Sequence, residues 1–169
     1  MIIQGTIETG KSFLISCLAD AFASICPDKP SPLLLLAPIG VAAFHINAQT
    51  IHSGLRIPVS NMLPLEGQSL LHLQEQLSHV QYILVDEMSF VGPTLFSQIE
   101  TRSCQILPSH KNSPFSERSV ILVGNLSQLP LVRDTPLYVG TSHGIALWCS
   151  FDTIVTLSII FCQQGDTPG

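Results

Sequence analysis

Short apolar stretches alternate with longer segments whose apolar residues recur at helical spacing, and this alternation runs through most of the chain. It predicts strands alternating with helices, as in a mostly parallel α/β sheet flanked by helices. We expect strands at residues 1–4, 33–37, 82–85, 120–123 and 153–157. Helices are expected at residues 11–25, 39–48, 69–78 and 93–106, the last with Pro93 in its first turn.

The other segments are expected to lack regular structure. Residues 50–67 form a polar excursion that contains prolines, residues 109–117 read as a polar loop, and residues 132–148 show no clear periodicity. The 169 residues suffice for one domain with a single core, and no internal repeat interrupts them.

The composition is unusually poor in charge for a free-standing domain. Only 11% of the residues are charged and the mean hydropathy is +0.40, whereas about 25% charged residues is typical. The longest apolar run has five residues, residues 33–37, far below the roughly 18 that a membrane span needs, and no signal peptide is visible. We therefore expect part of the surface to be covered by a second domain, a partner or a missing part of the same chain.

Charge and cysteine usage narrow the function further. The net charge of −5 offers no general attraction for nucleic acid, so any DNA contact must come from a local patch or from shape. The five cysteines form no C-x-x-C pair and the six histidines are dispersed. This distribution favours reduced intracellular thiols and ordinary packing over disulfides or a zinc site.

A phosphate-binding loop is the clearest chemical signal. Residues 5–12 read G-T-I-E-T-G-K-S, which fits G-x-x-x-x-G-K-[ST] and follows a short apolar start. Backbone N–H groups and Lys11 can surround phosphates there, while the Ser12 hydroxyl reaches Mg²⁺ and the helix dipole adds positive potential. The residues expected to hold the nucleotide are Gly5, Thr6, Thr9, Gly10, Lys11 and Ser12.

A second signal follows the strand expected at residues 82–85. Asp86 can hold Mg²⁺, and Glu87 can orient and deprotonate an attacking water. The competing interpretation is an exposed acidic pair at a strand end, but the upstream loop favours a nucleotide site whose parts face each other across neighbouring strand tips. Gln128 could touch a γ-phosphate, although its position alone is equally compatible with a solvated turn residue.

Five further segments lie in a fixed order after the phosphate-binding loop. They read L-A-P-I-G-V-A-A (36–43), Q-T-I-H-S (49–53), L-V-D-E-M-S-F-V (84–91), G-N-L-S-Q-L-P-L-V (124–132) and F-C-Q (161–163). Together with the loop they resemble the patterns G-x-A-G-T-G-K-S, A-P-T-G-x-A-A, T-x-H-S, D-E-x-S-M-V, G-D-F-x-Q-L-P-P-V and F-R-Q. These are motifs of the Pif-type (petite integration frequency) DNA helicases, including relatives carried by Helitron transposons.

The resemblance implies a RecA-like first motor domain of a 5′-to-3′ translocase on single-stranded DNA, driven by ATP and Mg²⁺. It implies that Lys11 and Ser12 bind phosphate and metal, that Asp86 binds the metal, that Glu87 is the base and that Gln128 senses the γ-phosphate. It also places Pro38, Gly40, Thr50, His52 and Ser53 along the DNA track. The family's work in DNA repair, recombination and telomere maintenance implies an intracellular protein, in the nucleus or alternatively the mitochondrion.

Four positions depart from the family's patterns. Glu8 stands where the family has Gly, Asn125 replaces Asp, Leu131 replaces Pro, and Cys162 replaces an Arg that resembles a cation for the transferring phosphate. A non-Gly residue at position 8 costs about 1 kcal/mol if φ is positive there.

We expect residues 1–169 to form one motor lobe, with the second lobe and the upstream adenine-binding segment absent. A single lobe cannot ratchet along DNA, because translocation needs two lobes that close and open. Two alternatives remain open: a non-catalytic remnant that acts by pairing with other chains, and, less favoured, a small-molecule kinase. The kinase would need an arginine-rich lid, which the four scattered arginines Arg56, Arg102, Arg118 and Arg133 do not supply.

Overall fold

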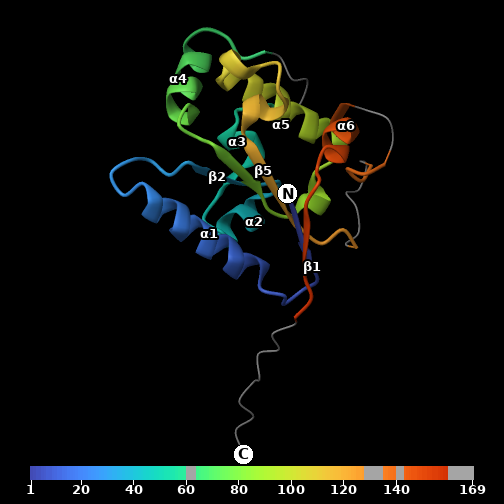
Figure 1. Cartoon of the computed structure of the whole chain (residues 1–169). Coiled ribbons are helices and arrows are strands. Elements are labelled where there is room, and N and C mark those ends of the chain that lie inside the picture. The colour runs from blue at the N-terminus through green and yellow to red at the C-terminus, as the bar shows by residue number, and fades with distance from the viewer. Residues whose placement is uncertain (60–63, 128–134, 140–142, 160–169) are drawn as a thin grey trace, which may run out of the picture.

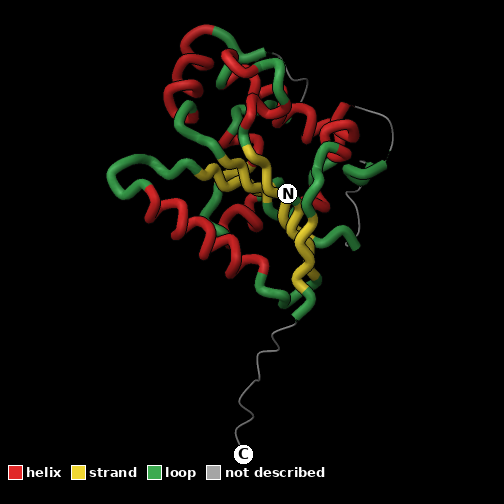
Figure 2. Tube along the Cα trace, viewed as in Figure 1, coloured by secondary structure: helices red, strands yellow, loops and turns green. Residues whose placement is uncertain are grey.

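The computed structural model describes residues 1–59, 64–127, 135–139 and 143–159. A six-stranded sheet runs through the middle of the molecule, and every pairing between its strands is parallel (Figures 1 and 2). The strands are β1 (Ile2–Gly5), β2 (Leu33–Ala37), β3 (Gln49–Thr50), β4 (Tyr82–Val85), β5 (Ser119–Gly124) and β6 (Ile154–Leu157). Their spatial order is β3-β2-β4-β5-β1-β6, so the predicted α/β parallel architecture is confirmed.

Helices cover both faces of the sheet. They are α1 (Lys11–Ile25), α2 (Gly40–His45), α3 (Ile51–Gly54), α4 (Gly67–Leu77), α5 (Pro93–Ile106) and α6 (His143–Cys149), with short 3₁₀ turns η1 (Met88–Phe90), η2 (Pro108–His110) and η3 (Pro114–Glu117). On one face, Ile15 of α1 packs with Ile3, Leu84 and Val123 of the strands. The larger cluster on the other face contains residues of α3 to α6, among them Phe96, which is fully buried.

The central strands are apolar because both of their faces are buried. In β4, Ile83, Leu84 and Val85 are at most 1% exposed, although successive side chains point to opposite sides of the sheet. A continuous apolar run is typical of a parallel strand that helices cover on both sides. The periodicity at residues 11–25 and 93–106 likewise matches α1 and α5 residue for residue.

Three sequence-based expectations were wrong in detail. Helix α2 covers only Gly40–His45 of the expected residues 39–48. The excursion at residues 50–67 includes Thr50, the last residue of the edge strand β3, and the one-turn helix α3. The segment 132–148 includes all of α6 except its last residue. These elements are too short for a periodicity signal, and each depends on a neighbour in space: β3 pairs with β2, and α6 packs against α5.

The connections that follow β1 and β5 leave the sheet on opposite faces. After β1 the chain enters α1, whose Ile15 belongs to one core cluster, and α6, which precedes β6, contributes Leu147 to the other. Adjacent parallel strands whose connections diverge in this way leave a crevice at their carboxyl ends, which is where ligands bind in open α/β sheets.

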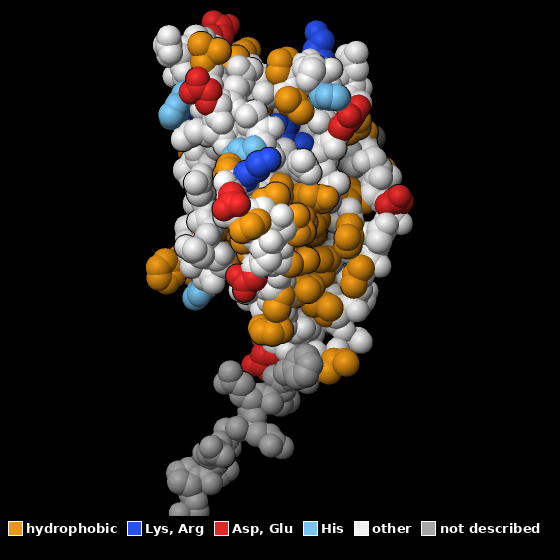
Figure 3. All heavy atoms as spheres, turned by 60° about the vertical axis from the view of Figure 1, so that its left-hand side comes forward, with side chains coloured by type: hydrophobic (Ala, Val, Ile, Leu, Met, Phe, Trp, Pro, Cys, Tyr) orange, Lys and Arg blue, Asp and Glu red, His pale blue; other side chains and the backbone are white. Residues whose placement is uncertain are grey.

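One face of the molecule is markedly apolar. Turned so that the α1 side of Figure 1 comes forward, the surface shows hydrophobic side chains gathered into a broad area with few charges (Figure 3). On α1 itself, Phe13 and Ile25 are 76% and 70% exposed. The apolar residues that make the sequence poor in charge therefore include many that are exposed on the surface.

Candidate active site

The loop between β1 and α1 forms one wall of the candidate site. It ends at Gly10, whose φ of 81° and ψ of 19° are left-handed and suit a residue without a Cβ. The first helical bond follows at once, since the Leu14 amide donates to the Gly10 carbonyl at 2.9 Å. The N–H groups in the first turn of α1, before Leu14, have no hydrogen-bond partner within the helix and can bind an anion.

Two side chains of the loop converge on one carbonyl. The Lys11 ammonium donates to the Gly5 and Thr6 carbonyls at 2.9 and 2.7 Å. The Thr9 hydroxyl donates to the same Thr6 carbonyl at 2.8 Å, and Thr9 is 5% exposed. Ser12 lies exposed in the first turn of α1. The structure thus brings the predicted phosphate-binding residues into one turn, with Lys11 folded back over it.

Glu8 lies in this loop with a φ of 63°, as expected if the position favours glycine. Its side chain is exposed, so water screens most of the repulsion between its carboxylate and a bound phosphate. The expected penalty is therefore mainly one of backbone strain, about 1 kcal/mol.

The acid pair follows β4, and burial governs both of its carboxyls. Asp86 is 7% exposed and its amide donates to the Leu36 carbonyl at 2.9 Å. Burial raises the pKa of Asp86, while a backbone hydrogen bond from Glu87 and the charge of Lys11 act against that rise. The pKa of Glu87 is raised mainly by burial and secondarily by the charge of Asp86, and the charge of Lys11 again opposes this rise. Lys11 is thus close enough for its charge to act on both carboxyls.

Glu87 combines a strained backbone with a carboxylate oxygen that has no partner among the described residues. It has a left-handed conformation with a φ of 51°, which costs a non-glycine residue free energy. Its Oε2 atom is buried and has no hydrogen-bond partner among the described residues. A buried acceptor without a partner is one that the proton of a bound water would satisfy.

The loop wall and the acid pair do not occupy neighbouring strand tips, contrary to expectation, because β5 lies between β1 and β4. The end of β5 is fitted closely to the acid pair. A Cβ added at Gly124 would lie 2.9 Å from the Met88 amide nitrogen, next to Glu87. Asn125 then accepts a hydrogen bond from the Ser127 amide at 2.9 Å and shapes the following turn. Gln128, Leu131 and Cys162 lie outside the described residues.

The residues expected along the DNA track gather at the other end of the same edge. Ala37 at the end of β2 pairs with Thr50 at the end of β3, which brings the Pro38–Gly40 turn beside the Thr50–Ser53 segment. Thr50 caps α3 by accepting from the Ser53 amide at 3.2 Å, and its hydroxyl also meets the Ser53 hydroxyl at 2.8 Å. His52 is half-buried. Thr50 and Ser53 thus have a structural role in addition to any contact with DNA.

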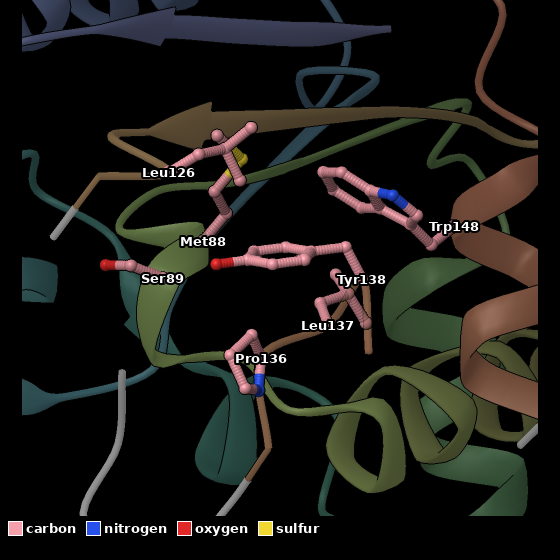
Figure 4. A pocket seen from close by; sticks show the side chains of 7 residues that line it. All are labelled: Met88, Ser89, Leu126, Pro136, Leu137, Tyr138 and Trp148. Atoms are coloured by element: carbon pink, nitrogen blue, oxygen red, sulfur yellow. The ribbon is translucent and has the colours of Figure 1, made fainter. Parts of the chain in front are cut away.

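Sequence reasoning missed a small apolar pocket next to the acid pair. It is lined by Met88, Ser89, Leu126, Pro136, Leu137, Tyr138 and Trp148 (Figure 4). The Tyr138 ring extends across it, with the hydroxyl end towards η1. No periodicity could have revealed it, because its walls come from four separate segments.

Three further findings concern the described residues alone. Within the described ranges, no cluster of three or more histidine, cysteine or acidic side chains could hold a metal ion. Cys17, Cys26, Cys104 and Cys149 are free thiols. No helix in the part of the chain that the structure describes is long and apolar enough to cross a membrane.

Comparison with known proteins gives concordant matches. The model of the PIF1-like helicase family matches residues 1–159. The ATP-dependent DNA helicase Pif1 of Campylobacter jejuni is 26% identical over 160 residues, covering 89% of this chain and 33% of the relative. The ATP-dependent DNA helicase PIF1 of Danio rerio is 31% identical over 138 residues, covering 78% of this chain and 20% of the relative.

The fold has solved counterparts. A Pif1 helicase from Bacteroides, crystallised with ADP-AlF3 and single-stranded DNA, superimposes with a TM-score of 0.69 at 24% identity, covering 98% of this chain and 39% of that one. At this identity the likeness establishes the RecA-like fold of the described residues. The chain spans between about a fifth and two fifths of the length of these relatives.

Proposed function

The chain belongs to the PIF1-like helicase family, and from this premise we propose that it is the first, nucleotide-binding motor lobe of an ATP-dependent DNA helicase. The observation that carries the proposal is that the phosphate-binding loop after β1 and the acid pair after β4 leave the same edge of the parallel sheet, with only β5 between them. A lysine in a phosphate-binding loop that faces a buried Asp86 and a half-buried Glu87 is the arrangement that nucleotide hydrolysis requires.

Each residue has a role in this proposal. The N–H groups before α1 and the Lys11 ammonium would hold the β- and γ-phosphates, and Ser12 and Asp86 would supply oxygen ligands for Mg²⁺. Bound there, Mg²⁺ would neutralise charge on the phosphates. Glu87 would orient a water through its unpartnered Oε2 and accept its proton, for which a raised pKa is suitable. Gln128 would report loss of the γ-phosphate.

The proposal extends to DNA through the edge formed by β2 and β3. Single-stranded DNA would pass over Pro38, Gly40 and the exposed side of the Thr50–Ser53 segment, on the side of the acid pair away from the phosphate-binding loop. A relative of the same fold was crystallised with ADP-AlF3 and single-stranded DNA, which supports single-stranded DNA as the ligand. Work on DNA would locate the protein in the nucleus or, alternatively, the mitochondrion.

Titration with a fluorescent ATP analogue in Mg²⁺ tests the nucleotide site. We expect saturable binding that Lys11→Ala weakens about 10- to 100-fold, the effect of losing a hydrogen bond between charged groups. Lys29→Ala is the matched control, because it removes the same charge from an exposed loop after α1. Absence of a saturable signal up to millimolar analogue, or equal loss in both variants, would reject the proposal.

The second candidate is that the chain is a non-catalytic remnant that acts by pairing with other chains, and Glu8 favours it. Its positive φ places strain inside the phosphate-binding loop itself, and a carboxylate there adds charge of the wrong sign. An ATPase assay with and without single-stranded DNA separates the two functions. DNA-stimulated turnover that Glu87→Gln abolishes excludes the remnant, whereas nucleotide binding without turnover supports it.

A further inference from the structure

The outer edge of β2 is only partly covered. Strand β3 pairs with Leu36 and Ala37, and no strand among the described residues pairs with residues 33–35 on that side. Asn47 has a left-handed φ of 52° and therefore turns the chain away before Gln49, so that β3 extends no further along β2. The unpaired part of a strand edge presents backbone N–H and C=O groups that a further strand can bind.

The direction of the backbone in β2 identifies the groups at this edge. The Leu36 carbonyl points towards β4 and accepts from the Asp86 amide at 2.9 Å. Because the backbone groups of successive residues in a strand point to opposite sides, those of Leu33 and Leu35 point towards the uncovered edge. The Leu33 amide already donates to the Ser31 hydroxyl at 3.3 Å. Among the described residues, the Leu33 carbonyl and the Leu35 amide are left as one acceptor and one donor.

A pocket lies against this edge. It has a volume of about 460 Å³, within the range of about 300–1,000 Å³ that ligand sites have. Leu33 and Leu34 line it together with the polar side chains of Gln49, Arg56, Gln76 and His79. The uncovered part of β2 is residues 33–35, and a strand of that length spans about 10 Å. The pocket and the edge together therefore suit a short extended peptide.

Arg56 gives the pocket its charge. The side chain is half-buried, and its guanidinium donates to the Ser69 carbonyl at 3.1 Å and to the Gln76 side chain at 3.4 Å. A guanidinium has five N–H donors, so others remain for a ligand. Neither contact is to an acid, and none of the described residues that line the pocket is acidic. A carboxylate on the ligand would therefore form a charge-assisted hydrogen bond with Arg56, which is stronger than a neutral one.

We propose that this pocket binds an extended peptide that carries an acidic side chain and adds to β2 as a parallel strand. A single peptide residue, opposite Leu34, donates to the Leu33 carbonyl and accepts from the Leu35 amide. Residues that pair in a sheet have their side chains on the same face, and Leu34 packs against the cluster that contains Ile51 of α3. The side chain of that peptide residue therefore extends towards Arg56, which follows α3, and this is the position for the acid.

A peptide fits these groups better than the phosphate backbone of DNA does. Phosphodiester oxygens accept hydrogen bonds but offer no donor to the Leu33 carbonyl, whereas each peptide residue supplies both a donor and an acceptor. The pocket lies on the β2–β3 side of the sheet, away from the phosphate-binding loop after β1. Peptide binding there does not depend on the proposed nucleotide site.

Fluorescence anisotropy with a labelled peptide of sequence T-V-E-V-T and blocked ends tests the proposal. We expect saturable binding with a Kd below about 1 mM. A methyl group on the glutamate nitrogen removes the N–H that bonds to the Leu33 carbonyl, and it should weaken binding about tenfold or more. A methyl group on the nitrogen of the following valine, which faces away from β2, should change the affinity less than about threefold.

Substitution of Arg56 tests the charge. Arg56→Gln should weaken binding of T-V-E-V-T about tenfold and leave binding of T-V-Q-V-T unchanged. Lys111→Gln is the matched control, because it removes an exposed charge that does not line the pocket, and it should alter neither.

Three results overturn the proposal. They are equal effects of the two methyl groups, an Arg56→Gln variant that weakens both peptides alike, and the absence of saturable peptide binding. If a thymidine oligonucleotide then binds in an Arg56-dependent way while the peptide does not, the pocket is a nucleic-acid site instead. The two methylated peptides need no variant, so they decide the question of strand addition even if Arg56→Gln fails to fold.

Discussion

Gly124 is the position where a single added methyl group tests the link between the fold and the candidate site. It ends β5 with a φ of 156°, and a Cβ there would lie 2.9 Å from the Met88 amide nitrogen and 3.0 Å from its Cγ. The Met88 side chain can move, but its backbone nitrogen cannot move without displacing Glu87, which precedes it. Gly124→Ala must therefore strain β5, shift η1, or do both.

The expected loss of stability has two parts. Overpacking a well-packed region costs about 1–3 kcal/mol, and a positive φ at a residue with a side chain costs about 1 kcal/mol more. The sum is about 2–4 kcal/mol, and about 2–4 °C is lost per kcal/mol in a chain of this length. Gly124→Ala should therefore lower Tm by about 5–15 °C.

Thermal unfolding followed by circular dichroism measures this loss, with Gly40→Ala as the control. A Cβ at Gly40, the first residue of α2, meets no atom within 4 Å. Alanine favours helix over glycine, so the control should match or slightly exceed the unmutated protein. If Gly124→Ala unfolds within about 1 °C of Gly40→Ala, the close contact between β5 and η1 is wrong, and so is the position inferred for Glu87.

Two further substitutions test buried charges. Asp86→Asn should stabilise the fold by on the order of 1 kcal/mol in urea unfolding at neutral pH, as removal of a costly functional group commonly does. Because burial raises the pKa of Asp86 above its ordinary value of 3.8, the unmutated protein loses stability as pH rises through the folded-state pKa. The advantage of the variant should therefore shrink towards pH 4, and one that does not depend on pH would refute this cause. Arg102 is fully buried and donates to the Gln105 side chain at 2.6 Å and to the Arg56 carbonyl at 3.1 Å. Arg102→Ala should cost about 3 kcal/mol by opening a cavity, and Arg102→Met clearly less; equal losses would show that the hydrogen bonds matter more than the volume.

The features that the sequence predicted are those encoded over a few consecutive residues. The phosphate-binding loop, α1 and α5 each have a local pattern, and their bounds agree with the structure. The position of Asp86 and Glu87 after β4 could be predicted for the same reason, because a four-residue apolar run followed by two acids defines it. The roles of these residues in binding and catalysis stay predictions.

The features that were missed depend on neighbours distant in the chain. Helix α6 approaches so closely that a Cβ at Gly144 would overlap the Pro93 carbonyl oxygen, a contact that no periodicity encodes. Strand β3 has two residues and exists because β2 is there to pair with it. Thr9 lines one pocket together with residues 156–159 at the end of β6, about 150 positions later in the chain. Pairing order, which separates the loop from the acid pair by one strand, is likewise decided by the whole sheet.

The free-energy costs at the sheet edge bear on whether the candidate site has a function or is only a part of the fold that persists without one. A carboxyl pair with raised pKa values, a left-handed Glu87 and a buried oxygen without a partner each reduce stability. A chain that needed only the fold would gain by replacing them, since apolar or amide side chains would remove these costs. The strain at Glu8 differs, because Glu8 lies in the phosphate-binding loop and its exposed carboxylate, largely screened by water, gives no favourable contact with phosphate. These costs at the acid pair are what a role in catalysis would predict, and the departure from the family's pattern lies instead in the loop proposed to hold the phosphates. From this asymmetry, weakened nucleotide affinity is the first defect to expect, ahead of any misplacement of Glu87.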